Sequence, residues 1–200
     1  MSPPDWRARK KAATRLAIQE HALRLFSEKG YDATTVEDIA TAAGVSHMTF
    51  FRYFPRKEEV VEYDEYDPMI AALVAARPAE ESPLEALHGA IRWGLEAILP
   101  TDGANVLART RLVLRTPALR SRNWIAQDAT IDVFATALAR RSGVAEPDFP
   151  ITVLAAAALG GMTVAITRWA DSDDADLLAL MDAAFSALQD LATSRPASRR

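Results

Sequence analysis

Apolar residues recur along this chain at the three- and four-residue spacing of amphipathic helices. The first such stretch is expected to end at Gly30, and its apolar stripe consists of Ile18, Ala22, Leu25 and Phe26. No stretch alternates apolar and polar residues as a half-buried strand would, and no repeat of fixed period is present. The pattern therefore predicts an all-α fold.

Two short helices are predicted next, each with a residue that favours a helix start. Thr35 can cap the first, because Asp38 stands three residues later, at the spacing of a capping box. Ser46 can cap the second, which is expected to run to about Phe54 and to stop at the proline that follows. Gly44 lies in the turn between them, where glycine tolerates a positive φ.

Prolines and glycines mark the ends of the later helices. A fourth, acidic helix is expected to begin near Arg56 and to kink or split at Pro68. Proline at the first helical position then predicts further starts near Pro83 and Pro117. About nine helices are expected in all, the last five covering roughly 83–100, 103–115, 117–143, 150–169 and 172–193.

Charge is distributed unevenly along the chain, whose formal net charge is −4. Residues 1–57 hold ten basic and six acidic side chains, whereas the remaining 143 residues hold 13 basic and 21 acidic ones. A basic segment joined to an acidic body is typical of a DNA-binding module attached to a partner-binding domain. The basic cluster at residues 7–15 fits either a DNA contact or a solvated tail; it comprises Arg7, Arg9, Lys10, Lys11 and Arg15.

Composition argues against several other classes of protein. The chain has no cysteine, no apolar secretory segment at its start and no uninterrupted run of about 18 apolar residues, so a cytoplasmic protein without a membrane partner is expected. Its three histidines lack metal-ligand spacing, and it carries no GxSxG, GxxxxGK[ST] or GxGxxG motif. No catalytic residue, metal site or cofactor is therefore expected. A helical-bundle enzyme or an adaptor without DNA binding is the alternative.

The segment 35–57, TVEDIATAAGVSHMTFFRYFPRK, contains the pattern that indicates function. Ala40 is small, as the crossing of two helices requires, while Phe50 and Phe54 stand four residues apart and are expected to face inward. The segment resembles the DNA-binding domain of the tetracycline-repressor (TetR) family, whose hallmark is IAxxAGVSxxTxYxxFxxKxxL. The matching positions, within a similarity of about 50 residues, are Ile39, Ala40, Ala43, Gly44, Val45, Ser46, Thr49, Phe54 and Lys57.

The resemblance implies a role in DNA binding for individual residues. His47, Met48 and Thr49 would lie nearest the base edges in the major groove. Phe51 stands where the family usually has tyrosine, so it cannot donate a hydrogen bond and would pack against a sugar or a thymine methyl group. The other implied contacts are Thr35 and Lys57 to phosphates, Tyr53 through its phenol, and Ser46 and Arg52.

The remainder of the chain resembles the C-terminal domain of mycofactocin-system regulators, in RLVLRTPALRSR and AAALGGMTVAITRWAD. This resemblance implies a small-molecule effector such as a long-chain acyl-CoA, and a homodimer formed through the last two helices. The small residues of 155–161, AAAALGG, would let helix backbones approach closely. A two-fold dimer implies a palindromic operator, from which effector binding would release a repressor.

The expected domains are a helix-turn-helix domain at 1–56, a ligand-binding and dimerisation domain at 57–194, and a disordered tail at 195–200. Apolar and aromatic residues of the middle helices could line the ligand pocket, or could be ordinary core. Arginines around one helix junction could hold phosphates of the ligand, or could form a solvated face. The expected ligand-binding set is Trp93, Arg109, Leu112, Arg115, Trp124, Phe134 and Met162, with Arg111, Arg120 and Arg122 as further phosphate candidates.

Overall fold

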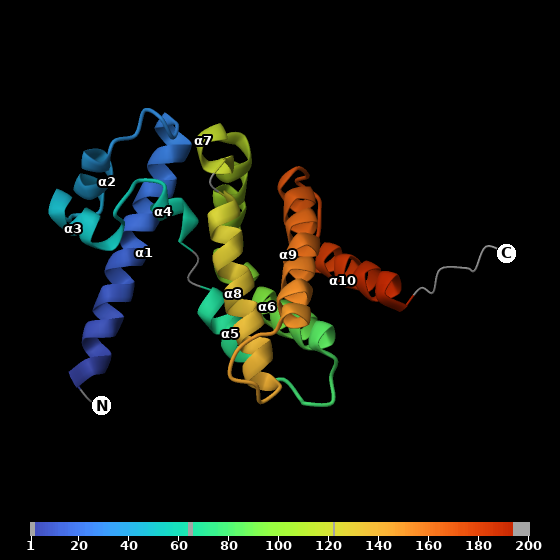
Figure 1. Cartoon of the computed structure of the whole chain (residues 1–200). Helices are drawn as coiled ribbons and strands as arrows, with labels where there is room; N and C mark the ends of the chain where they lie inside the picture. Colours follow the sequence, from blue (N-terminus) through green and yellow to red (C-terminus); the bar gives the residue numbers. More distant parts are fainter. Residues whose placement is uncertain (1–2, 64–65, 122, 194–200) are drawn as a thin grey trace. The chain divides into compact units, whose positions relative to one another are not determined.

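The computed structural model of this 200-residue chain describes residues 3–63, 66–121 and 123–193, without the side chains of 3–5, 8, 67–68 and 123–126. Ten helices and no strand occur among these residues, which agrees with the all-α prediction (Figure 1). The helices are α1 (Pro3–Lys29), α2 (Val36–Ala42), α3 (His47–Tyr53), α4 (Glu59–Glu62), α5 (Asp67–Ala75), α6 (Pro83–Arg115), α7 (Pro117–Arg120), α8 (Asn123–Arg141), α9 (Phe149–Ala170) and α10 (Leu177–Thr193).

The chain folds into two compact units, and each unit is built from two separate stretches of the sequence. The N-terminal unit comprises residues 1–63 and 104–123, and the C-terminal unit comprises residues 64–103 and 124–200. This division differs from the boundary expected at residue 56. Val60, Val61 and Leu119 are all buried in the N-terminal core, so α4 and α7 belong to that unit.

The N-terminal core is built on the apolar stripe of α1. Ile18 is completely buried there, together with Ile39 of α2 and Phe50 of α3. The two short helices thereby pack against a long one, which fixes their positions. Gly30 ends α1 with a φ of 88°, as the sequence indicated.

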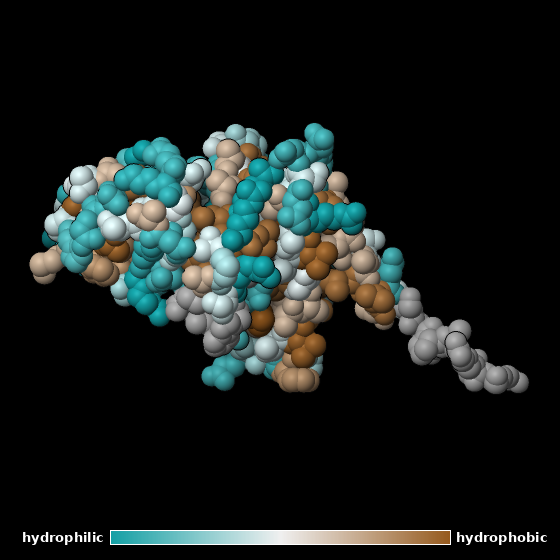
Figure 2. Space-filling view, turned by 90° about the horizontal axis from the view of Figure 1, so that it is seen from above, coloured by the Kyte–Doolittle hydropathy of each residue, from teal (hydrophilic) through white to brown (hydrophobic). Residues whose placement is uncertain are grey.

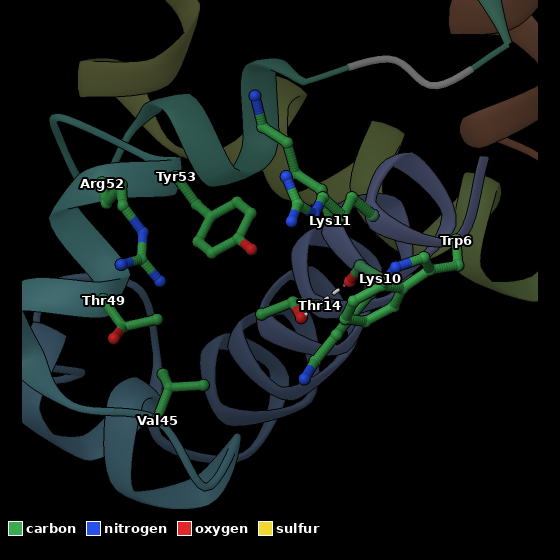
Figure 3. Close-up of a pocket in the computed structure, with 9 residues that line it drawn as sticks. Trp6, Lys10, Lys11, Thr14, Val45, Thr49, Arg52 and Tyr53 are labelled. Atoms are coloured by element: carbon green, nitrogen blue, oxygen red, sulfur yellow. Dashed lines mark hydrogen bonds between the residues drawn. The ribbon is translucent and has the colours of Figure 1, made fainter. Parts of the chain in front are cut away.

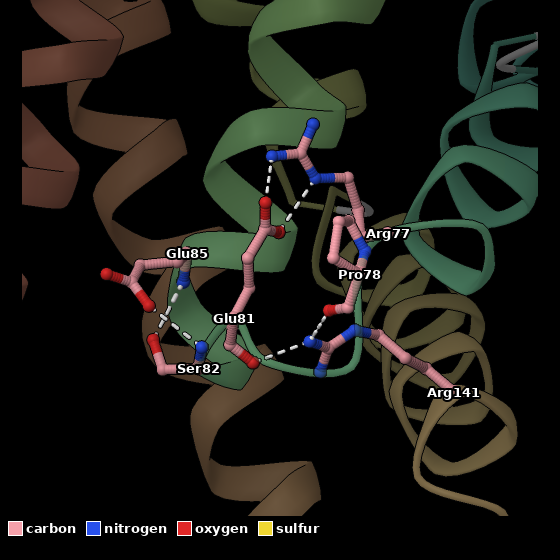
Figure 4. A network of polar contacts seen from close by, with 6 residues as sticks. All are labelled: Arg77, Pro78, Glu81, Ser82, Glu85 and Arg141. Atoms are coloured by element: carbon pink, nitrogen blue, oxygen red, sulfur yellow. Dashed lines mark hydrogen bonds and ion pairs between the residues drawn. The ribbon is translucent and has the colours of Figure 1, made fainter.

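The C-terminal core combines side chains of five helices. Val74 of α5, Ile91 of α6 and Phe134 of α8 are completely buried in one cluster, which also contains Ala158 of α9 and Phe185 of α10. The loop between α5 and α6 is held to α8 by Arg141, whose guanidinium donates hydrogen bonds to the carbonyl oxygens of Pro78 and Glu81 (Figure 4).

Three predicted helix boundaries are wrong. The last helix starts at Leu177, where the Asp176 carboxylate accepts the N–H groups of the first turn, rather than at residue 172. Helix α6 continues through Pro100, where the sequence predicted a break, because side chains on both sides of the proline are packed: Leu99 against the C-terminal core and Leu112 against the N-terminal core. The long helix predicted from Pro117 is instead divided into α7 and α8. Leu119 is anchored in the N-terminal core, whereas Phe134 belongs to the C-terminal core. The predicted division of the acidic helix is confirmed, since Pro68 lies in the first turn of α5.

Helices α9 and α10 pack against each other and leave apolar side chains exposed. Val164 of α9 is 67 % exposed and Leu191 of α10 is 75 % exposed. In the face seen in Figure 2, hydrophobic residues gather at the surface over these two helices. Among the described residues, α9 is the one helix long and apolar enough to cross a membrane by length and composition, a test that core helices of globular proteins also pass; 22 % of its apolar stretch is buried.

Candidate nucleic-acid interface

Helix α2 begins with a complete capping box. The backbone N–H of Asp38 donates to Thr35 Oγ1 at 3.1 Å, and the backbone N–H of Thr35 donates to Asp38 Oδ2 at 3.0 Å. Hydrogen bonding of the Asp38 carboxyl to the backbone and side chain of Thr35 lowers the pKa of that carboxyl below its ordinary value. The predicted cap is confirmed, and it fixes the residue at which α2 starts.

The turn between α2 and α3 has the geometry that Gly44 was predicted to provide. Gly44 has a φ of 65°, and the N–H of Val45 donates to the Ala40 carbonyl at 2.9 Å. Ser46 then caps α3 by accepting the N–H of Thr49 at 3.1 Å. The turn and the cap together set the direction in which α3 leaves the turn.

One face of α3 is buried and the opposite face is exposed, as the spacing predicted. Phe50 is 0 % exposed and Phe54 is 1 % exposed, whereas Met48 is 84 % exposed. His47 is also exposed, and its Nε2 lies 3.0 Å from Glu37 Oε1 of α2. Phe51 packs edge-on against His47, with ring centroids 4.7 Å apart. The outward face therefore presents His47, Met48 and Phe51, and the helix is held to the core by the buried Phe50 and Phe54.

The C-terminal turn of α3 carries Arg52 and Tyr53. Arg52 is exposed, and its guanidinium lies 5.5 Å from the centre of the Tyr53 ring. Tyr53 is half-buried and packs against the N-terminal core. The two residues form one surface beside the outward face of α3.

Lys57 is half-buried and binds the chain between α1 and α2. Its Nζ donates to the carbonyl oxygens of Tyr31 at 2.9 Å and Thr34 at 3.1 Å, and it lies 4.1 Å from the centre of the Tyr31 ring. The Tyr31 hydroxyl donates to Glu58 at 3.0 Å, and burial together with this bond raises the pKa of Tyr31. Lys57 therefore positions the start of α2, a role that the sequence did not indicate.

Two polar side chains of α1 support the far end of the motif. Arg15 donates to the Tyr53 carbonyl at 3.0 Å, and its guanidinium lies 4.5 Å from the centre of the Tyr63 ring. Gln19 is only 4 % exposed, and its amide donates to the carbonyls of Val60 at 2.8 Å and Tyr63 at 2.9 Å. Arg15, which the sequence grouped with the basic cluster at residues 7–15, is thus a packed residue within α1.

The expected ligand-binding residues are divided between the two units. Phe134 and Met162 are buried in the same C-terminal core cluster, whereas Trp93 on α6 is 54 % exposed. In the N-terminal unit, Leu112 packs against the core, Arg115 is exposed, and Arg109 donates to the Tyr63 carbonyl at 2.8 Å. The side chain of Trp124, and all of Arg122, lie outside the described residues.

Two capped short helices joined at a glycine turn, with one exposed face and a buried phenylalanine face, define a helix-turn-helix DNA-binding unit. Models of two family domains match the chain. "Bacterial regulatory proteins, tetR family" matches residues 18–63, and "MftR C-terminal domain" matches residues 81–193. The chain belongs to the TetR family of transcriptional regulators.

Individual relatives agree with this assignment over most of the chain. The transcriptional regulator TcmR of Streptomyces glaucescens is 37% identical over 94% of this chain and 87% of its own length. The putative mycofactocin biosynthesis regulator MftR of Mycobacterium tuberculosis is 29% identical over 88% of this chain and 90% of its own. The crystal structure of Thermus thermophilus FadR with lauroyl-CoA matches with a TM-score of 0.57 and 26% identity, over 93% and 98% of the two chains.

The protein is therefore a transcriptional regulator with an N-terminal helix-turn-helix, as the sequence predicted. Its family and its relatives are regulators rather than enzymes, which decides against the alternative of a helical-bundle enzyme. The same family membership decides against an adaptor that lacks a DNA-binding domain.

Proposed function

We propose that this regulator inserts α3 into the major groove of its operator and reads bases through His47, Met48 and Thr49. The observation that carries the proposal is the exposure of Met48. Its side chain is 84 % exposed, on a helix that Ser46 caps and that the buried Phe50 holds to the core. A thioether in that position is poorly suited to water and well suited to an apolar base edge such as a thymine methyl group. The contact of His47 Nε2 with Glu37 Oε1, at 3.0 Å, orients the imidazole on the same face.

The DNA backbone is contacted by residues around the recognition helix. Thr35 and Ser46 each stand at the start of a short helix, where free backbone N–H groups favour phosphate. Arg52 and Tyr53 flank α3, and Phe51 packs against a sugar or a thymine methyl. Lys57 has three N–H donors, two of which bind carbonyl oxygens of the protein, so a single donor is left to reach a phosphate.

Helices α9 and α10 pair with those of a second copy to form a four-helix dimer interface. Their exposed apolar side chains support this proposal, since Val153, Val164 and Leu191 are each at least 48 % exposed. Gly160 has open space around it, so a helix of the partner can approach α9 closely there. The two-fold dimer then binds a palindromic operator whose half-sites lie about one turn of DNA, roughly 34–36 Å, apart.

The C-terminal unit binds the effector, which is an amphipathic molecule of the acyl-CoA class. Support comes from the Thermus thermophilus relative, whose structure holds lauroyl-CoA. The proposed apolar contacts are Phe134, Met162, Trp93 and Trp124. The other residues predicted from the sequence to bind the ligand lie farther along α6, in the part that belongs to the N-terminal unit; they are Arg109, Leu112 and Arg115.

Effector binding releases the operator by moving α6. This helix contributes residues 83–103 to the C-terminal unit and 104–115 to the N-terminal unit. Arg109 on its second part binds the carbonyl of Tyr63, directly after α4. A shift of α6 is thereby passed to α4, which changes the separation of the two recognition helices and favours the repressor that is not bound to DNA. The regulator acts where its DNA lies, in the cytoplasm.

The DNA-binding proposal is tested by selecting duplexes from random DNA with the purified protein and measuring affinity at several salt concentrations. We expect salt-sensitive, sequence-selective binding. His47→Ala and Met48→Ala should each change the preferred bases, whereas Lys57→Ala should weaken binding to all sequences alike. Selection of no common sequence would contradict the proposal, and a change of base preference caused by Lys57→Ala alone would contradict the docking.

The effector proposal is tested by mass spectrometry of the ligand that co-purifies with the protein, and by adding lauroyl-CoA to the protein–operator complex. Release of the operator by lauroyl-CoA at concentrations at which free coenzyme A has no effect is the expected result. An operator complex that is insensitive to acyl-CoA of every chain length would contradict the assignment of this class.

A further inference from the structure

The N-terminal half of α1 and the outer side of α3 enclose a groove of about 500 Å³ (Figure 3). From α1, Trp6, Lys10, Lys11 and Thr14 face this groove, and Thr49 and Arg52 of α3 face them from the other side. All of these residues belong to the N-terminal unit, so the groove is a feature of that unit alone. Its existence depends on α1 starting at Pro3, well before the first residue of the apolar stripe, Ile18.

The described lining of this groove is strongly basic. It contains the four cations Arg7, Lys10, Lys11 and Arg52 and no carboxylate. In a concave site the fields of like charges add, so a polyanion is attracted more strongly there than to the same residues spread along a tail. The charge therefore points to a phosphate-rich occupant.

Trp6 gives the groove an exposed flat surface. Its side chain is 54 % exposed, and Lys10 Nζ lies 5.6 Å from the centre of the indole ring. This contact restrains the ring against α1 through a cation–π interaction. An exposed indole beside two lysines suits a deoxyribose ring flanked by phosphates, since the sugar offers an apolar surface and the phosphates take the charge.

We propose that this groove binds the sugar–phosphate backbone of the operator outside the bases read by α3. Thr49 and Arg52 belong both to the groove and to the DNA-facing surface of α3, so DNA held by α3 continues directly into the groove. The inference rests on the proposed function of α3. It adds a contact without base readout, and it extends the length of DNA that each protomer protects.

The test uses the full chain and a duplex selected from random DNA, made in a long form and in a short form cut back to the selected bases. Lys10→Gln/Lys11→Gln should bind the long duplex about tenfold more weakly at 0.15 M salt, and the slope of log K against log salt should fall by about 1.8. The ranking of base sequences should stay unchanged. Trp6→Ala should weaken binding to the long duplex with little change in the slope, because it removes no charge.

The matched control is Arg24→Gln/Arg140→Gln, which removes the same charge from exposed positions outside the groove and outside α9 and α10. This control should bind like the unchanged protein. On the short duplex, the lysine variant and the unchanged protein should have affinities that differ by less than about twofold, since the flanking backbone is gone.

Equal affinity and equal salt slope of the lysine variant and the control on the long duplex would overturn the inference. So would an equal loss on both duplexes, because the lysines would then act on the core site. Either result leaves the proposed function of α3 standing. Failure of the unchanged protein to select any sequence would instead overturn the proposed function itself.

Discussion

Several basic and polar residues around the helix-turn-helix bind the protein's own carbonyl groups. Lys57 donates to two carbonyls of the chain between α1 and α2, and Arg15 donates to the Tyr53 carbonyl at the end of α3. Both cations also lie against aromatic rings. At the scale of the residue, then, charge in this unit serves two purposes: exposed cations such as Arg52 remain available to DNA, and packed ones fix the helices that carry them.

Lys57→Ala should destabilise the fold in addition to weakening DNA binding. Two part-buried carbonyl oxygens lose their donor, so the free energy of unfolding should fall by about 1–3 kcal/mol. Urea denaturation followed by circular dichroism measures the change. Arg56→Ala is the control, because it removes only an exposed ion pair with Glu59 and should cost less than about 1 kcal/mol. Equal stability of the two variants would contradict the positioning role of Lys57.

Asp38→Asn should reveal a pH-dependent contribution of the α2 cap. The hydrogen bonds from Thr35 lower the pKa of the folded carboxyl, so the cap's contribution is complete above the ordinary pKa of 3.8 and is lost as pH falls through the lower, folded pKa. The difference in unfolding free energy between the unchanged protein and Asp38→Asn should therefore be largest near neutral pH and shrink in acid. A difference that grows as pH falls would contradict this sign.

At the scale of the element, short helices are held in place by their ends. Helices α2 and α3 have seven residues each, too few to be stable alone. Thr35 and Ser46 satisfy N–H groups at their starts, and Gly44 allows the turn between them. Packing on α1 supplies the remainder, because Ile39 and Phe50 are completely buried.

Gly44→Ala should strain the turn and weaken both stability and operator binding. The φ of 65° lies in the left-handed region, which costs a residue with a Cβ about 1–2 kcal/mol. No atom lies within 4 Å of an added Cβ, so the loss would reflect backbone strain alone. Gly103→Ala, within α6, is the control and should stabilise the protein by about 0.5–1 kcal/mol. Thermal unfolding of both variants measures this, and a Gly44→Ala protein as stable as the unchanged one would contradict it.

At the scale of the whole molecule, the chain leaves the N-terminal unit after residue 63 and returns to it for residues 104–123. Because α6 belongs to both units, a change in the C-terminal core has a continuous helical path to Arg109 and Tyr63. The C-terminal unit also exposes apolar surface on α9 and α10 that a single copy leaves in water. The proposed signal transfer through α6 and the proposed dimerisation through α9 and α10 therefore involve different helices.

Val164→Glu should separate the proposed dimer. The two-fold axis would place two carboxylates in an apolar interface, so the dimer dissociation constant should rise at least about 100-fold, which corresponds to about 2.8 kcal/mol. Sedimentation equilibrium measures this directly. Val144→Glu is the control, since Val144 is 47 % exposed beyond the end of α8, and it should leave the dimer intact. A Val164→Glu protein that remains as dimeric as this control would contradict the interface.

Local sequence was enough to predict the helical fold, the helix-turn-helix and the buried face of α3, although Tyr53, predicted to face outward, packs against the core. Caps, the glycine turn and the pairing of Phe50 with Phe54 depend on residues within four positions of one another, so local sequence is enough to predict them. The split at Pro68 followed from the same local chemistry. Likewise, the family hallmark is confined to one continuous segment, and its assignment is confirmed by the family models.

The partners of Lys57 and Arg15, the continuity of α6 through Pro100 and the division into two units depend on tertiary packing. Arg15 and Tyr53 are 38 residues apart, and Arg109 and Tyr63 are 46 apart, so no local pattern indicates that they meet. The same is true of the groove between Trp6 and Arg52. Whether a proline ends a helix depends on how firmly the residues before and after it are packed. Whether a lysine faces water depends on which groups the fold brings near it, and both are settled only once the chain has folded.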